Sequence, residues 1–213
     1  MLNKHSNRFI LLCVSGLLSA CAATPSAHFY TLEAQSLTPV ATTPAIAKKP
    51  LIGIGPLSLP AVLDRRQIVT YAADNSLQMA EFELWAAPLK DNILAVLSKN
   101  IAALQPNALV KAYPWSAYGN ADYHVIVDIT RFDTQLGQSV NLEAGWAIME
   151  EKTHTIIGNG QAKIQQSLND AGYAGATQAL SKLLGKFSQQ LAQALTLAQQ
   201  AASNSEQRPC PSK

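Results

Sequence analysis

The chain has 213 residues, with 16 Lys and Arg against 14 Asp and Glu and a hydrophobic fraction of 48%. This length and apolar content are ordinary for one globular domain with extra terminal segments, and they exclude wholesale disorder. Both excess positive charges, Lys4 and Arg8, lie among the first twenty residues, where no acidic residue occurs. The rest of the chain is formally neutral and lacks clustered Lys and Arg, so we expect no nucleic-acid partner.

The N-terminus is typical of a secretory signal. Its basic start is followed by an apolar run over residues 9–18, which is shorter than the ~20 residues of a membrane-spanning helix. Then comes Leu18-Ser19-Ala20-Cys21, which resembles the lipobox at which bacterial lipoproteins are acylated and cut. We therefore predict a lipoprotein signal peptide over 1–20, cleaved between Ala20 and Cys21. The alternative is an ordinary signal peptide with an incidental cysteine.

Acylation of Cys21 would supply a firm membrane anchor. A diacylglycerol and an N-linked acyl chain such as palmitate bury many methylene groups, each contributing ~0.8 kcal/mol. Residue 22 is Ala and not Asp, which by resemblance to enterobacterial sorting rules implies the outer membrane, with the domain facing the periplasm. Cys13 would leave with the signal peptide. Cys210 would then be the remaining thiol, and we predict that it stays free in a polar tail, with cross-linking as the alternative.

After a short tether over 21–27, the first half of the mature chain alternates short strands with turns. Apolar and β-branched runs bounded by Pro, Gly, Asp and Asn predict strands. Residues 34–50, rich in Ala, Thr and Pro, predict a loop. Leu89, Ile93 and Leu97 recur at helical spacing, which predicts a helix over 88–104 with one buried face. The strands expected in this half cover residues 29–32, 51–55, 67–71, 77–82 and 108–113.

Three longer alternating segments predict an antiparallel meander with one buried face, over 123–130, 140–148 and 155–165. A second helix is expected over about 170–199, and the polar segment 200–213 is predicted to be disordered. The expected fold is one α+β domain over 28–199, in which a mainly antiparallel sheet is covered by two helices.

No catalytic or metal-binding constellation stands out. His124 and Asp128 would share one face of a strand but lie ~13 Å apart, too far for a base and its orienting carboxylate. His28 and His154 have no second ligand at a short motif spacing, so no zinc site is expected. Phosphate-binding glycine loops and hydrolase motifs are missing from the sequence. We therefore expect neither an enzyme nor a cofactor beyond the covalent lipid.

Four segments together resemble the ABC-type transport auxiliary lipoprotein family, the PqiC-like proteins. The first two are Phe-Tyr-Thr-Leu over 29–32 and the run over 52–69, which contains Leu-Asp-Arg-Arg-Gln-Ile-Val. The others are Ala-Glu-Phe-Glu-Leu-Trp-Ala-Ala-Pro-Leu over 80–89 and the strands over 122–146. The chain departs from the family pattern at three positions: Arg66 stands in place of Pro, Leu84 in place of Arg, and Ala87 in place of Glu.

The resemblance implies a fold like the N-terminal domain of TolB. It also implies an outer-membrane lipoprotein that works with an MCE-domain tunnel protein and its inner-membrane permease, moves lipid or other hydrophobic compounds, maintains envelope integrity, and forms homo-oligomers. A structural or assembly lipoprotein without a transport role is the alternative, and a periplasmic hydrolase is a third class. The candidate partner-contact residues are Asp64, Arg65, Phe82, Trp85 and Arg131.

Each of these candidates also has a purely structural interpretation. Phe82 and Trp85 fit plain core packing against the first helix. Asp64 and Arg65 fit a role in stabilising the loop that follows Pro60.

Overall fold

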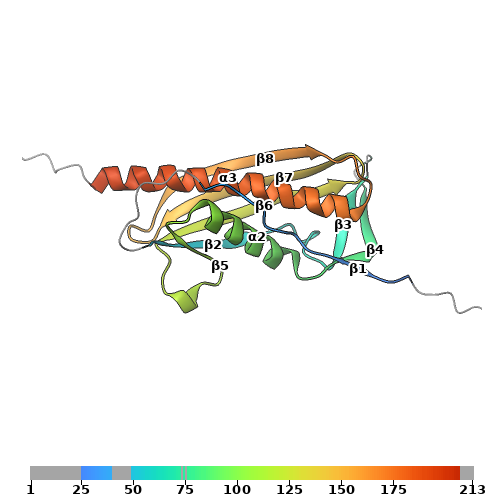
Figure 1. Cartoon of the computed structure of the whole chain (residues 1–213), viewed down its shortest axis with the longest axis horizontal. Helices are drawn as coiled ribbons and strands as arrows, with labels where there is room; N and C mark the ends of the chain where they lie inside the picture. Colours follow the sequence, from blue (N-terminus) through green and yellow to red (C-terminus); the bar gives the residue numbers. More distant parts are fainter. Residues whose placement is uncertain (1–24, 40–48, 73, 75, 207–213) are drawn as a thin grey trace, which may run out of the picture.

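The computed structural model describes residues 25–39, 49–72, 74 and 76–206 (Figure 1). The predicted signal peptide, its cleavage site at Ala20 and Cys21, and Cys210 lie outside these residues. Two sheets and two long helices form an elongated body in which the helices cover one face of the larger sheet. The smaller sheet lies at the end of the body from which the N-terminal segment leaves (Figure 1).

The larger sheet has five strands in the order β5-β2-β6-β7-β8. β6 (Tyr123–Gln135), β7 (Ser139–Glu150) and β8 (Thr155–Ser167) form the predicted antiparallel meander. β2 (Leu51–Ser58) instead runs parallel to both β5 (Leu109–Ala112) and β6. The chain leaves β2, builds the second sheet and a helix, and returns through a crossover, which brings the next strand back parallel. The expectation of a mainly antiparallel sheet is therefore only roughly met.

The smaller sheet has the order β1-β4-β3. β3 (Gln67–Tyr71) and β4 (Leu77–Trp85) form an antiparallel hairpin, and β1 (His28–Tyr30) adds to β4 in parallel. β4 is longer than the sequence predicted, because its last three residues pair with β1. The N-terminal strand is therefore built into the same sheet as the segment that opens the first helix.

The helices are α2 (Leu89–Leu104) and α3 (Tyr173–Glu206), and a short 3₁₀ turn, η1 (Ser116–Tyr118), follows β5. α3 continues to Glu206, so residues 200–206 of the tail predicted to be disordered are helical. Ala and Gln, both strong helix formers, dominate residues 198–202 and explain the extension. None of the helices within the described ranges is both long and apolar enough to cross a membrane.

The core lies between the helices and the larger sheet. Its fully buried side chains come from alternate positions of the strands and from one stripe of each helix, as the hydrophobic periodicities predicted. Ile52 and Ile54 of β2 and Leu97 of α2 have no exposed surface, and neither do Leu184 and Phe187 of α3. The main cluster also includes Trp85 at the end of β4, which joins the smaller sheet to the core.

An extended segment over residues 31–37, which we call the strap, follows β1 and crosses α2 and α3 (Figure 1). Leu32 inserts into the core with 4% of its surface exposed. The backbone N–H of Gln35 donates to Asn100 Oδ1 at 2.9 Å. The fully buried Asn100 in turn donates to the Ser188 hydroxyl at 3.1 Å. One side chain of α2 thus holds both the strap and α3.

α3 contributes a second attachment. The N–H of Glu33 donates to the Ser181 hydroxyl at 3.1 Å. A Cβ atom at Gly185 would lie 2.8 Å from the side chain of Gln35, so only glycine lets the strap lie this close to the helix. The strap is therefore part of the folded domain and not a flexible leader.

We predict that Asn100→Ala lowers the free energy of unfolding by about 1–3 kcal/mol, because it leaves the Gln35 N–H without its partner. Denaturant unfolding followed by circular dichroism would measure the change. Asn159→Ala, at an exposed position of β8, is the matched control and should change the stability by less than about 0.5 kcal/mol. Equal effects of the two substitutions would contradict the role of Asn100.

Candidate functional site

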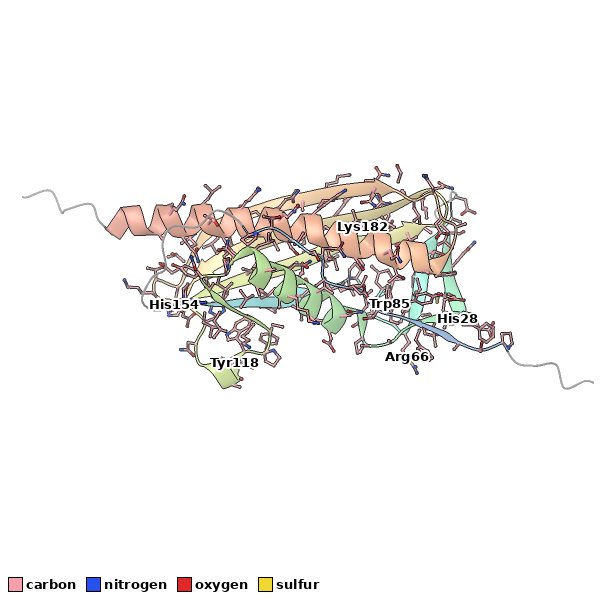
Figure 2. The ribbon with its side chains drawn as sticks, in the orientation of Figure 1. His28, Arg66, Trp85, Tyr118, His154 and Lys182 are labelled. Carbon is pink, nitrogen blue, oxygen red and sulfur yellow. The ribbon has the colours of Figure 1, made fainter. Side chains whose placement is uncertain are left out.

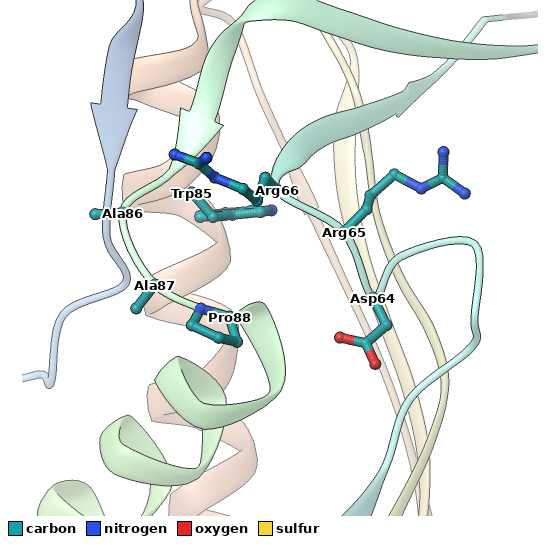
Figure 3. A pocket seen from close by; sticks show the side chains of 7 residues that line it. All are labelled: Asp64, Arg65, Arg66, Trp85, Ala86, Ala87 and Pro88. Atoms are coloured by element: carbon teal, nitrogen blue, oxygen red, sulfur yellow. The ribbon is translucent and has the colours of Figure 1, made fainter.

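A pocket of about 400 Å³ lies between the loop that precedes β3 and the junction of β4 with α2 (Figure 3). It is formed by the two sequence motifs that carry the family resemblance most specifically. They meet because β3 and β4 are paired, with Gln67 opposite Leu84 and the Trp85 N–H donating to the Arg66 carbonyl at 2.7 Å. The lining residues are Asp64, Arg65, Arg66, Trp85, Ala86, Ala87 and Pro88.

The loop on one side of the pocket is held by its own turn. The Leu63 N–H donates to the Pro60 carbonyl at 2.8 Å, and the Arg65 N–H donates to the Leu63 carbonyl at 2.9 Å. The Arg65 guanidinium donates to the Val62 carbonyl at 2.8 Å, so this side chain is held by its own loop. In Figure 3 it points away from Trp85 and Pro88.

The other side of the pocket is tied to the N-terminal strand and to the start of α2. Trp85 is 4% exposed and packs into the main core. The Ala86 N–H donates to the Tyr30 carbonyl at 2.8 Å, which continues the β1–β4 ladder by one bond. Pro88 is the N-cap of α2, and Asp91 places a carboxylate in the first turn, as the helix dipole favours.

Two opposite charges stand at the mouth of the pocket. Asp64 and Arg66 are both exposed. Across the described ranges of the chain, neither side chain forms a hydrogen bond or an ion pair. Figure 3 shows the Arg66 side chain on the Trp85 side of the pocket and the Asp64 carboxylate on the Pro88 side. The site therefore offers an apolar floor between a free cation and a free anion.

The structure brings together three of the five candidate contact residues. Asp64, Arg65 and Trp85 line the pocket, whereas Phe82 is half-buried on β4 and Arg131 lies on β6, both outside it. The burial of Trp85 matches the core-packing alternative, and one edge of its side chain still reaches the pocket. Sequence reasoning missed Arg66, although it flagged this position as a departure from the family pattern. Ala87, another departure, also lines the pocket.

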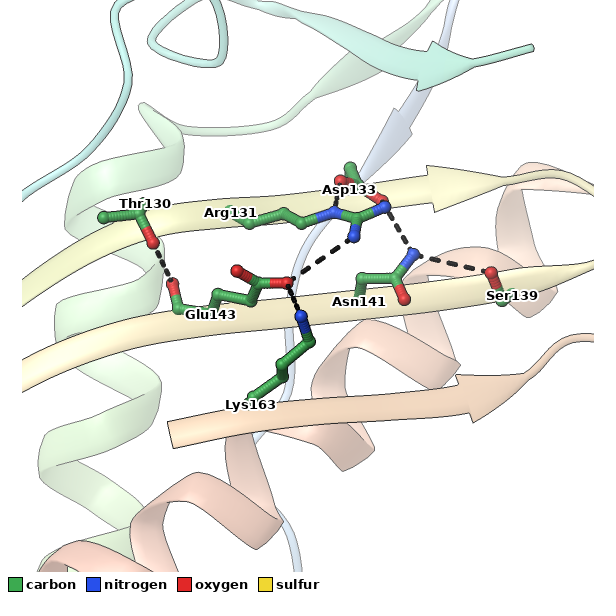
Figure 4. A network of polar contacts seen from close by, with 7 residues as sticks. All are labelled: Thr130, Arg131, Asp133, Ser139, Asn141, Glu143 and Lys163. Carbon is green, nitrogen blue, oxygen red and sulfur yellow. Dashed lines mark hydrogen bonds and ion pairs between the residues drawn. The ribbon is translucent and has the colours of Figure 1, made fainter. Parts of the chain in front are cut away.

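Arg131 belongs to an ion-pair network on the outer face of the meander (Figure 4). Its guanidinium pairs with the buried carboxylate of Asp133 and lies 3.6 Å from Glu143, which also pairs with Lys163 at 3.1 Å. Asn141 donates to Asp133 at 2.9 Å. The hydrogen bond to Asp133 raises the pKa of Arg131. The hydrogen bond from Lys163 lowers the pKa of Glu143, and the positive charge of Arg131 lowers it further. The network joins β6, β7 and β8 and gives Arg131 a structural role.

His124 and Asp128 do not meet in one site, although His124 and His154 share Glu151 as a neighbour. Asp128 accepts a hydrogen bond from the Ser58 hydroxyl, while His124 Nε2 lies 3.1 Å from the carboxylate of Glu151. His154 Nδ1 lies 3.9 Å from the same carboxylate. The contact of Glu151 with His124 and His154 could not be predicted from the sequence, because Glu151 comes from the turn between β7 and β8. Among the residues placed by the structure, no group of three or more His, Cys, Asp and Glu could hold a metal ion.

Three titratable side chains join β1 to β4 beside the pocket. The Tyr30 hydroxyl donates to Glu83 Oε2 at 2.5 Å, and His28 Nδ1 lies 3.0 Å from Glu83 Oε1. The hydrogen bond from Tyr30, followed by that from His28, lowers the pKa of Glu83 below its ordinary value of 4.5. The same bond to Glu83 raises the pKa of Tyr30 from 10.0 to about 12. Folding therefore favours an ionised Glu83 beside a protonated Tyr30.

We predict that Glu83→Gln lowers the thermal midpoint most between pH 4.5 and pH 10.0. Because folding lowers the pKa of Glu83, the ionised Glu83 side chain stabilises the fold fully above pH 4.5. This stabilisation disappears as the pH falls through the lowered pKa. Because folding raises the pKa of Tyr30, the contribution of the tyrosine is present below 10.0 and is lost as the pH rises towards 12. Thermal unfolding from pH 3 to 9 would measure the difference.

The control for this pH series is Glu81→Gln, an exposed position two residues earlier on β4. Its midpoint should stay close to that of the wild type across the range. A difference between wild type and Glu83→Gln that is the same at pH 3 and pH 7 would show that Glu83 does not act through its charge.

Two solved structures have a fold similar to that of this chain. In the crystal structure of a Xanthomonas campestris protein of the DUF330 family, the matched region covers 84% of this chain and 99% of that one, with 16% identity and a TM-score of 0.69. The crystal structure of an uncharacterized protein matches 79% of this chain and 98% of its own length, with 17% identity and a TM-score of 0.65. At these identities the two structures establish a shared fold. The comparison with curated protein sequences found no significant match.

The family of the chain is identified from its sequence. The profile of a family described as the ABC-type transport auxiliary lipoprotein component matches residues 30–192, from the end of β1 to the middle of α3. That range includes the strap, the core of both sheets and every residue that lines the pocket. The chain is therefore a member of the ABC-type transport auxiliary lipoprotein family.

Proposed function

We propose that the protein is anchored in the outer membrane through acylated Cys21 and acts in the periplasm as the accessory subunit of an MCE-type transport system for lipid or other hydrophobic compounds. Membership of the transport auxiliary lipoprotein family is the observation that carries this proposal. The lipobox-like Leu-Ser-Ala-Cys over 18–21 supplies the anchor, and the residue after it favours the outer membrane. The system would maintain envelope integrity.

The geometry of the domain supports a docking role close to a membrane. His28 is the seventh residue after Cys21, so the tether reaches at most ~25 Å. The smaller sheet and the pocket then lie at the end of the body nearest the bilayer, with Tyr118 and His154 towards the other end (Figure 2). The anchor confines the domain to the membrane surface and raises its effective concentration for a partner that spans the periplasm.

In this proposal the partners are the MCE-domain tunnel protein and its inner-membrane permease, and the domain acts as a homo-oligomer. The alternative, a structural or assembly lipoprotein of the outer membrane, shares the anchor but needs no such partner. Catalysis has no part in either function. His124 and Asp128, the pair weighed for a hydrolase, have separate neighbours in the fold.

We predict that Cys21→Ala abolishes acylation and removes the chain from the outer-membrane fraction, because the anchor thiol is lost while the domain is unchanged. Membrane fractionation and intact-mass spectrometry would measure the outcome. Cys13→Ala, in the predicted signal peptide, is the matched control and should leave both acylation and location unchanged. A processed Cys21→Ala chain that remains in the outer membrane would contradict the anchor.

We also predict that affinity purification of the acylated full-length chain from chemically cross-linked envelopes recovers an MCE-domain protein. Cys21→Ala should reduce the recovery at least tenfold, because the unanchored domain loses the effective concentration that the membrane provides. Quantitative mass spectrometry would compare the two chains. A stable complex that contains no MCE-domain protein would favour the structural or assembly alternative.

A further inference from the structure

We propose that the pocket between Asp64 and Arg66 binds the phosphoethanolamine headgroup of a membrane phospholipid, with the phosphate at Arg66 and the ammonium at Asp64. The inference rests on the proposed function, because it takes the β1 end of the domain to lie beside a bilayer. The proposal assigns a class of ligand to the pocket and gives Arg66 and Asp64 the role of recognising it.

The two charges at the mouth of the pocket match the two charges of this headgroup. Arg66 has an exposed guanidinium that no side chain of the described residues engages, and guanidinium groups bind phosphate through paired N–H donors. Asp64 has an equally free carboxylate, which accepts hydrogen bonds from a primary ammonium. Arg65 does not compete for the phosphate, because its guanidinium is held by the Val62 carbonyl and by Met79.

The space between these charges suits the uncharged part of the ligand. The floor is formed by Trp85, Ala86, Ala87 and Pro88, and the rings of Trp85 and Pro88 present apolar surface to the carbon atoms that join phosphate and ammonium (Figure 3). The volume of about 400 Å³ falls within the roughly 300–1,000 Å³ of small-molecule sites. A mostly apolar lining with a few convergent charged groups is the usual composition of such sites.

The surrounding charges favour a zwitterion over a purely anionic ligand. Around the pocket, Asp64, Glu81 and Glu83 are matched in number by Arg65, Arg66 and Lys90, so this end of the molecule has no excess of positive charge. A phosphoglycerol headgroup or an acidic peptide therefore gains no net attraction from these surroundings, whereas a headgroup that carries both charges can pair with both Arg66 and Asp64. A quaternary ammonium is also less suitable, because it has no N–H to donate to Asp64 and prefers several exposed aromatic rings.

The position of the pocket favours a lipid over a soluble ligand. The Ala86 N–H is bonded to the Tyr30 carbonyl, so the floor of the pocket is attached directly to the first strand. Tyr30 is the ninth residue after Cys21, which gives a reach of at most ~30 Å. Because the acyl chains of Cys21 lie in the bilayer, the mouth of the pocket is held within reach of the headgroup layer.

The test uses the acylated full-length chain in phosphatidylcholine vesicles that contain a small fraction of photoreactive phosphatidylethanolamine or photoreactive phosphatidylglycerol. We expect phosphatidylethanolamine to label the peptides around residues 61–66 and 85–88, with phosphatidylglycerol labelling them several-fold less. Arg66→Gln should weaken labelling by phosphatidylethanolamine about tenfold, the effect of losing one charge-assisted hydrogen-bonding group. Peptide mass spectrometry locates and quantifies the labelled sites.

Asp64→Asn separates recognition of a zwitterion from simple attraction of phosphate. This substitution should lower labelling by phosphatidylethanolamine about tenfold and leave labelling by phosphatidylglycerol unchanged or higher. Lys182→Gln removes an exposed positive charge from α3, away from the pocket, and is the matched control for Arg66→Gln (Figure 2). Thermal unfolding of each variant verifies that the domain remains folded.

Equal labelling by the two lipids, or equal effects of Arg66→Gln and Lys182→Gln, would overturn the headgroup site. So would labelling confined to other surfaces. Any of these results, obtained with a chain that still fractionates with the outer membrane and purifies with an MCE-domain protein, would leave the proposed function intact. A wild-type chain that is not acylated, or that purifies without such a protein, would instead count against the proposed function.

Discussion

The fold depends on the attachment of its N-terminal segment to the two helices. Asn100 of α2 is fully buried and accepts from the strap while donating to Ser188 of α3. A buried amide is costly unless its groups are paired, so this residue fixes the relative position of three segments that are distant in the sequence. β1 precedes the strap directly and completes the smaller sheet, so the same attachment also sets the place of Tyr30 beside the pocket.

The pocket follows from the register of one hairpin. β3 and β4 are paired so that the chain before β3 and the chain after β4 emerge at the same edge, which brings Arg66 next to Trp85. The tryptophan is shared between the core and the pocket, so its position is fixed by packing and not by a ligand. The polar groups at the mouth stand on a loop closed by its own backbone hydrogen bonds. A rigid apolar floor with charged side chains at its rim is thus assembled before anything binds.

Much of this architecture could be predicted from sequence periodicity, because the meander and both helices bury one regular face each. The parallel pairing of β2 could not, since strand direction depends on the crossover and leaves no mark in the alternation of residues. The end of α3 was placed too early because a polar composition suggested disorder where Ala and Gln continue the helix. At the site, Asp64, Arg65 and Trp85 were found through their motifs. Arg66 was missed because only the fold shows that its side chain lines the pocket and forms no ion pair with the residues that the structure describes.

The arrangement of the strap also determines how the domain responds to mechanical load. A pull on the N-terminal segment acts along β1, whose bonds to β4 run between parallel strands, and then along the strap. The contacts at Gln35 and Glu33 would be loaded together in shear and not one after another, as happens when a terminus is peeled away. Leu32 would have to leave the core before either helix could separate. The attachment therefore passes tension on the N-terminal segment into the centre of the domain.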